Sequence, residues 1–130
     1  MVAIDTNIVV RLLVNDDPAQ TQKVKALFEA EKIFIPKTVV LETEWVLRGV
    51  YKIDCEPINN ALRALLLLEQ VIVEDETALF DALDAHKQGM DFADAIHLAS
   101  SPRATSFATF DAKFISKAMK LSRKLTVKAP

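Results

Sequence analysis

The chain has 130 residues, of which 51% are hydrophobic and 26% are charged. This length and balance are typical of one globular domain, so we expect residues 1–130 to form a single domain. No apolar run approaches the roughly 18 residues that a membrane-spanning helix needs, and the first residues lack a basic, cleavable leader. The one cysteine, Cys55, cannot form an internal disulfide, which is typical of a reducing compartment. We therefore predict a cytoplasmic protein with no membrane partner.

The net charge of −2 hides an uneven distribution of charge along the chain. Residues 1–100 carry 9 Lys and Arg against 17 Asp and Glu, whereas residues 101–130 carry 7 against 1. The seven basic residues are Arg103, Lys113, Lys117, Lys120, Arg123, Lys124 and Lys128. A basic segment in an otherwise acidic chain is typical of an enzyme that attracts a polyanion. A solvated helix face explains the same composition, so charge alone leaves both interpretations open.

Short β-branched runs alternate with longer amphipathic stretches along the whole chain. They predict strands at residues 2–4, 33–35, 71–73, 106–110 and 125–127. They predict helices at residues 7–13, 18–30, 38–50, 58–68, 76–87, 92–100 and 112–119. We expect side-chain oxygens of Asn7, Thr38 and Asp91 to cap three of these helices. This alternation predicts an α/β sandwich around a mostly parallel sheet of about five strands.

Four acidic residues stand where a predicted strand ends or a predicted helix begins: Asp5, Glu42, Asp94 and Asp111. Each follows or lies among apolar residues, where a carboxylate needs a partner if it is buried. Taken singly, each acid is explained by helix capping or by turn formation. Taken together they can converge at one sheet edge, where parallel α/β sheets bind ligands. Such a set of oxygen ligands indicates a site for Mg²⁺ or Mn²⁺.

Other kinds of site have little support in the sequence. There is no cysteine pair or histidine cluster for zinc, and two glycines are too few for a phosphate-binding loop. His97, one helical turn after Asp94, is expected at the rim of the site rather than as a general base. We expect His86 and Glu44 to be exposed to solvent, and acidic neighbours to raise the pKa of Cys55.

The sequence resembles the PIN-domain ribonucleases, and within them the VapC-type toxins of prokaryotic type II toxin–antitoxin pairs. The resemblance rests on motifs in a fixed order along the chain: MVAIDTN at 1–7, TVVLETEWVL at 38–47, DFADAIH at 91–97 and TFD at 109–111. It implies a PIN-like three-layer α/β/α sandwich. It also implies an Mg²⁺- or Mn²⁺-dependent endoribonuclease that cleaves RNA phosphodiester bonds with metal-activated water. Residues 100–107 lack the glycine that many members carry there, which bears on the placement of Asp111.

The resemblance assigns roles to particular residues and partners. Asp5, Glu42, Asp94 and Asp111 match the family's acidic quartet of catalytic metal ligands. Asn7 and Thr109 match positions that support the site or contact substrate, and Asp91 either joins the site or only caps its helix. The resemblance further implies a homodimer, an RNA substrate and a cognate VapB-like antitoxin protein that blocks the site.

Two other functions compete with this interpretation. A phosphatase-like α/β domain would use Asp5 as a nucleophile, but it usually needs a second acid at the position that Asn7 occupies. A PIN-fold RNA-binding module without turnover would use the basic segment to hold RNA. The retained carboxylates argue against such a module, because they repel RNA.

Overall fold

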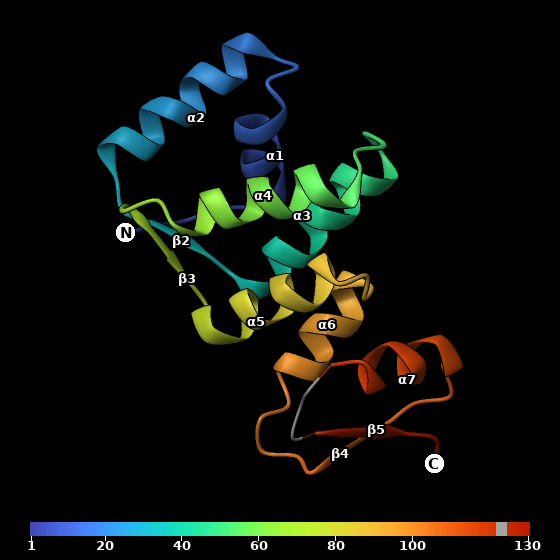
Figure 1. Cartoon of the computed structure of the whole chain (residues 1–130). Coiled ribbons are helices and arrows are strands. Elements are labelled where there is room, and N and C mark those ends of the chain that lie inside the picture. The colour runs from blue at the N-terminus through green and yellow to red at the C-terminus, as the bar shows by residue number, and fades with distance from the viewer. Residues whose placement is uncertain (122–124) are drawn as a thin grey trace. The chain divides into compact units, whose positions relative to one another are not determined.

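The computed structural model describes residues 1–121 and 125–130 (Figure 1). The chain divides into two compact units, Met1–Glu76 and Thr77–Pro130, which we call unit 1 and unit 2. Each unit is described by itself below. The single domain expected over residues 1–130 stays a prediction.

Unit 1 contains a parallel sheet of three strands in the order β1-β2-β3. The strands are β1 (Val2–Ala3), β2 (Ile33–Ile35) and β3 (Val71–Val73). Val2 lies opposite Ile33, which in turn lies opposite Val71. Ile33 and Ile35 of the central strand are fully buried, as expected for a parallel sheet covered by helices.

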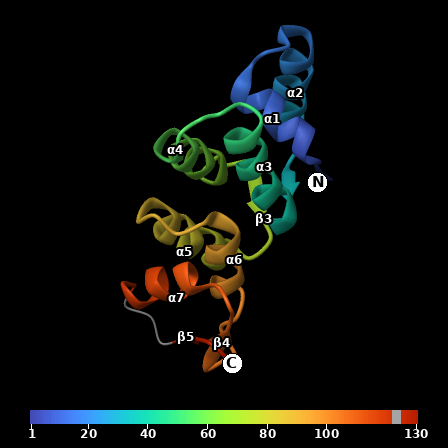
Figure 2. The same cartoon turned by 90° about the vertical axis from the view of Figure 1, so that its right-hand side faces the viewer.

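Four helices complete unit 1: α1 (Thr6–Val14), α2 (Pro18–Ala30), α3 (Lys37–Gly49) and α4 (Cys55–Leu66). Helix α1 packs against α2 and α3, and α3 packs against α4 (Figure 2). Their shared core is fully buried and is formed by Val9, Val40, Leu47, Ile58 and Leu62. Burial of such side chains stabilises each helix more than its own propensity does.

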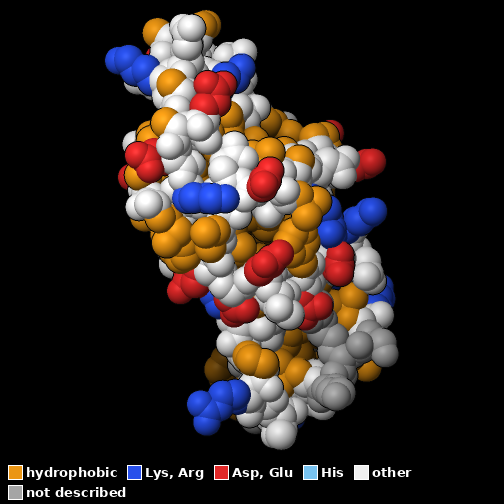
Figure 3. Space-filling view, turned by 90° about the vertical axis from the view of Figure 1, so that its left-hand side faces the viewer, with side chains coloured by type: hydrophobic (Ala, Val, Ile, Leu, Met, Phe, Trp, Pro, Cys, Tyr) orange, Lys and Arg blue, Asp and Glu red, His pale blue; other side chains and the backbone are white. Residues whose placement is uncertain are grey.

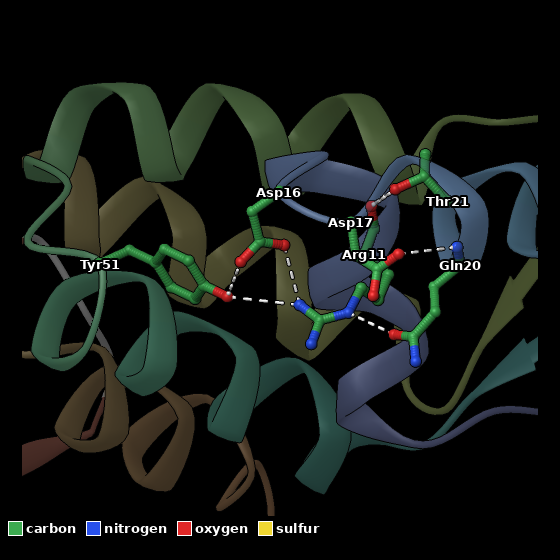
Figure 4. A network of polar contacts seen from close by, with 6 residues as sticks. All are labelled: Arg11, Asp16, Asp17, Gln20, Thr21 and Tyr51. Atoms are coloured by element: carbon green, nitrogen blue, oxygen red, sulfur yellow. Dashed lines mark hydrogen bonds and ion pairs between the residues drawn. The ribbon is translucent and has the colours of Figure 1, made fainter.

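A polar network fixes the turn between α1 and α2 (Figure 4). Arg11 donates from Nη1 to Asp16 Oδ1 at 2.8 Å and from Nε to Gln20 Oε1 at 2.6 Å. The Tyr51 hydroxyl, which follows α3, donates to Asp16 Oδ2 at 2.8 Å. Asp17 caps α2 by accepting a bond from the Gln20 amide at 3.1 Å. The network therefore holds α1 in register with α2 and with the end of α3.

Unit 2 contains α5 (Glu76–Lys87, starting at the boundary), α6 (Phe92–Ala99), α7 (Ala112–Met119) and two strands. The strands β4 (Ser106–Ala108) and β5 (Thr126–Lys128) are parallel, with Phe107 opposite Val127. Leu79, Leu83 and Phe92 are fully buried. The rings of Phe107 and Phe114 lie 5.4 Å apart, which packs α7 against β4.

The predicted α/β class is confirmed, because the described residues form seven helices and five strands and every strand pairing is parallel. This architecture is consistent with a PIN-like α/β/α fold. Several boundaries shift by a few residues: β4 ends at Ala108, and α4 begins at Cys55. In the described part of the chain, no helix combines the length and the apolarity that crossing a membrane requires.

Two predicted helix caps are wrong. Asp5 rather than Asn7 caps α1, and Asn7 lies inside the first turn. Pro36 rather than Thr38 precedes α3, which has no side-chain cap of its own. The Lys37 amide instead donates to Glu74 Oε1 at 2.9 Å, so an acid distant in sequence replaces the local cap. The third cap, Asp91, is confirmed.

Candidate functional site

Three of the predicted site residues are aspartates that cap helices. Asp5, Asp91 and Asp111 accept backbone N–H bonds at Oδ1 from Thr6 (2.7 Å), Asp94 (3.1 Å) and Phe114 (3.0 Å). The helix N-terminus favours the ionised carboxylate at each position. In each case the second oxygen, Oδ2, accepts no hydrogen bond from the residues that the structure describes. Each capping aspartate therefore keeps one oxygen for another ligand.

In unit 1 a single hydroxyl connects the end of β1 to α3. Thr6 is buried, and its Oγ1 donates a short hydrogen bond to Oε1 of Glu42. Asp5 directly precedes Thr6 and is exposed, as is Glu42. The bond therefore ties Glu42 to the residue that follows Asp5. Asn7 is exposed and makes no side-chain hydrogen bond to the described residues.

In unit 2 three acids share one electrostatic environment. The pKa of Asp94 is raised, first by partial burial and then by the negative charges of Asp91 and Asp111. The charge of His97 acts in the opposite direction. Asp91 and Asp111 are exposed, whereas Asp94 is half-buried. The charges of Asp91 and Asp111 thus reach Asp94. The assignment of these three carboxylates to one site stays a prediction.

Thr109 has a defined role in this group. Its Oγ1 accepts a bond from the Asp111 amide at 3.0 Å, and its own amide donates to Lys128 O at 3.0 Å. Asp111 is thereby held at the start of α7, beyond the carboxyl end of β4. This is where ligands bind to parallel sheets.

The predicted quartet is divided between the two units: Asp5 and Glu42 lie in unit 1, and Asp94 and Asp111 lie in unit 2. That the four form one site stays a prediction. No group of three or more His, Cys, Asp or Glu side chains among the described residues is arranged to hold a metal ion. The donor chemistry nevertheless fits Mg²⁺ or Mn²⁺, because every donor is a carboxylate oxygen. The pKa of Asp94 is raised by partial burial and then by the charges of Asp91 and Asp111, and a divalent cation would offset these charges.

Two predictions about polar side chains near this region are wrong. Glu44 is only 2% exposed and pairs with Arg48, with 2.9 Å between Oε2 and Nε. His86 is only 5% exposed, and its ring meets the ring of Phe92 edge-on at 5.2 Å. Glu44 lies four residues after buried Val40 and three before buried Leu47, so the sequence already placed it on the buried face of the helix. The role of Thr6 was also missed, and nothing in its sequence context distinguished it.

The basic segment lies partly beside the acids of unit 2. Lys113 is exposed two residues after Asp111, in the first turn of α7. The Lys117 Nζ lies 3.4 Å from the position that a Cβ atom on Gly89 would take. Gly89, whose φ of +102° suits glycine, precedes Asp91 by two residues. Arg103, Lys120 and Lys128 are exposed, and Arg123 and Lys124 lie outside the described residues. Unit 2 therefore presents cations close to its carboxylates.

The sequence matches a known protein family. Residues 2–120 match the model of the PIN domain, a segment that contains all seven predicted site residues. No curated protein matches the sequence. PIN domains are typically nucleases that act on nucleic acids and use divalent ions such as Mg²⁺ or Mn²⁺. Because the match covers most of its length, we conclude that this chain belongs to the PIN domain family.

Proposed function

We propose that the chain is a metal-dependent endoribonuclease and the VapC-type toxin of a type II toxin–antitoxin pair. The observation that carries the proposal is the placement of Asp94 within the matched segment, where partial burial and then the charges of Asp91 and Asp111 raise its pKa. A protein gains nothing in stability from carboxylates that repel one another. They are useful where a cation and a phosphate come together.

In the proposed mechanism, the residues that would hold Mg²⁺ or Mn²⁺ are Asp5, Glu42, Asp94 and Asp111. When bound, this ion supplies positive charge that lowers the pKa of the attacking water and neutralises the phosphate. The chain's own part is to fix the donors. In unit 1, the hydrogen bond from Thr6 orients Glu42. In unit 2, the hydrogen bond from the Asp111 backbone amide to Thr109 Oγ1 orients Asp111.

The reaction is hydrolysis of a phosphodiester bond within RNA. The oxygen of water forms a new bond to phosphorus, one bridging P–O bond breaks, and the departing oxygen takes a proton. The cations of unit 2, which include exposed Lys113, attract the RNA backbone towards the acids. The expected setting is the cytoplasm.

Two protein partners belong to the proposal: a VapB-like antitoxin that covers the site and a second copy of the chain. Several large apolar side chains of unit 1 are exposed, as a homodimer would require: Trp45, Val50, Leu67 and Ile72. Figure 3 shows hydrophobic side chains at the surface of one face, between acidic and basic ones. Trp45 is 57% exposed, so among the described residues it is a surface rather than a core side chain.

The test is cleavage of total bacterial RNA by the purified chain with Mg²⁺, Mn²⁺ or EDTA. Asp5→Asn and Asp111→Asn should abolish cleavage, and Asp17→Asn should leave it unchanged. The three substitutions are matched, because each replaces a capping aspartate by asparagine, which caps a helix equally well. A folded wild type that cleaves no RNA in any metal contradicts the proposal. RNA binding without cleavage would instead favour the PIN-fold binding module.

A further inference from the structure

We propose that Phe110 stacks on a base of the RNA substrate and so positions the adjoining phosphate at Asp111. The inference rests on the proposed ribonuclease function and adds a substrate-positioning residue to it. Phe110 lies in the connection between β4 and α7 (Figure 1), directly between Thr109 and Asp111.

Phe110 is unlike the other phenylalanines of the chain. All seven lie in the described residues, and six are buried or half-buried, whereas Phe110 is 89% exposed. A single exposed apolar side chain is common on protein surfaces and needs no function by itself. The case for a function therefore rests on how this side chain is held and on what surrounds it.

The backbone on both sides of Phe110 is fixed by hydrogen bonds. The Thr109 amide donates to Lys128 O, and the Asp111 amide donates to Thr109 Oγ1, each at 3.0 Å. The Phe114 amide then donates to Asp111 Oδ1 at 3.0 Å, which starts α7. A ring presented from a fixed backbone loses little conformational entropy when a ligand binds. Phe110 is therefore a preorganised surface aromatic.

The neighbours of Phe110 indicate a nucleic acid as its ligand. Asp111 follows it and shares the electrostatic environment of Asp94. Lys113, exposed three residues later on the first turn of α7, supplies a cation for a flanking phosphate. An aromatic ring followed by a carboxylate and a lysine offers one contact each for a base, a metal-bound phosphate and a flanking phosphate. Single-stranded RNA is recognised in this way, by stacking of unpaired bases on aromatic side chains.

The experiment measures binding and cleavage separately, with full-length protein. A short, unstructured RNA of mixed sequence carries 2-aminopurine, whose fluorescence falls when it stacks. In EDTA, wild type should bind the probe and quench it. Phe110→Ala should bind roughly 5- to 150-fold more weakly, the equivalent of about 1–3 kcal/mol, and should quench less. Phe110→Trp should restore both, because tryptophan also stacks.

Met119→Ala is the matched control, since Met119 is 79% exposed at the other end of α7. It should bind and quench as wild type does. Equal binding and quenching by wild type and Phe110→Ala would overturn the inference, as would a wild type that does not bind the probe. So would a Phe110→Ala variant whose only change is its oligomeric state in gel filtration. RNA cleavage by wild type in Mn²⁺ is measured in a separate assay. A failure of the proposed ribonuclease function is thereby distinguished from a failure of the stacking inference.

Discussion

The two units place aspartates at helix N-termini in the same way but in different electrostatic surroundings. In unit 1, Asp16 next to the cap of α2 has a lowered pKa, because Tyr51 and Arg11 bond to its carboxylate. In unit 2, Asp94 behind the cap of α6 has a raised pKa, because it is partly buried next to two other acids. The first arrangement stabilises a fold. The second costs stability and is expected where function requires it.

The largest effect should come from removing the charge of one acid in each unit. Asp5→Asn and Asp94→Asn should each lower cleavage at least about 100-fold, the scale on which loss of a charge-stabilising group acts in an active site. Asp94→Asn should also raise the melting temperature, because it removes a carboxylate from a repulsive group. Cleavage assays and thermal unfolding of the metal-free variants measure the two effects. If Asp5→Asn cleaves as wild type does, the proposed role of Asp5 in catalysis is refuted.

Core truncation should test how the two units fold. Leu62 in unit 1 and Leu83 in unit 2 are both fully buried, so changing either to alanine should cost about 2–5 kcal/mol of unfolding free energy. Urea unfolding followed by circular dichroism measures this cost. If residues 1–130 form one domain, both variants should keep a single transition with a lower midpoint. A second transition in either variant would show that the units unfold separately.

Removing the Thr6 hydroxyl should have a smaller effect on activity. Thr6→Val keeps the shape of the side chain but removes the donor that holds Glu42. The loss should be about 10- to 100-fold in cleavage or metal affinity, the range for groups that orient a metal ligand. Thr21→Val is a control for a buried threonine that bonds only to the backbone, at Arg11 O. Equal activity of both variants would mean that Glu42 needs no support from Thr6.

The sequence predicted the helices and strands well, because they leave local patterns. The helix at 18–30 and the strands at 33–35 and 71–73 are confirmed at the predicted residues. Asp91 and Asp111 lie next to predicted element ends, and the structure confirms both as caps.

What the sequence could not predict depends on contacts distant along the chain. Glu74 replaces the cap expected from Thr38, and Thr6 meets Glu42 across 36 positions. Glu44 and His86 were assigned to solvent because of their polarity, although helical spacing places them with buried residues. Burial of a polar side chain depends on its partners, Arg48 for Glu44 and the ring of Phe92 beside His86.

The smallest expected effect is the pH-dependent contribution of Asp16, in unit 1, to the stability of the fold. The pKa of Asp16 is lowered chiefly by the Tyr51 hydroxyl, so its bonds stabilise the folded chain at pH values above the ordinary aspartate pKa. This contribution is lost as the pH falls through the lowered pKa, because the protonated carboxyl no longer attracts Arg11. Tyr51→Phe should therefore lower the melting temperature slightly at neutral pH and not at all once Asp16 is protonated. Thermal unfolding of the variant and wild type across acidic pH measures the difference, and a gap that stays constant with pH would assign the effect of Tyr51 to packing instead.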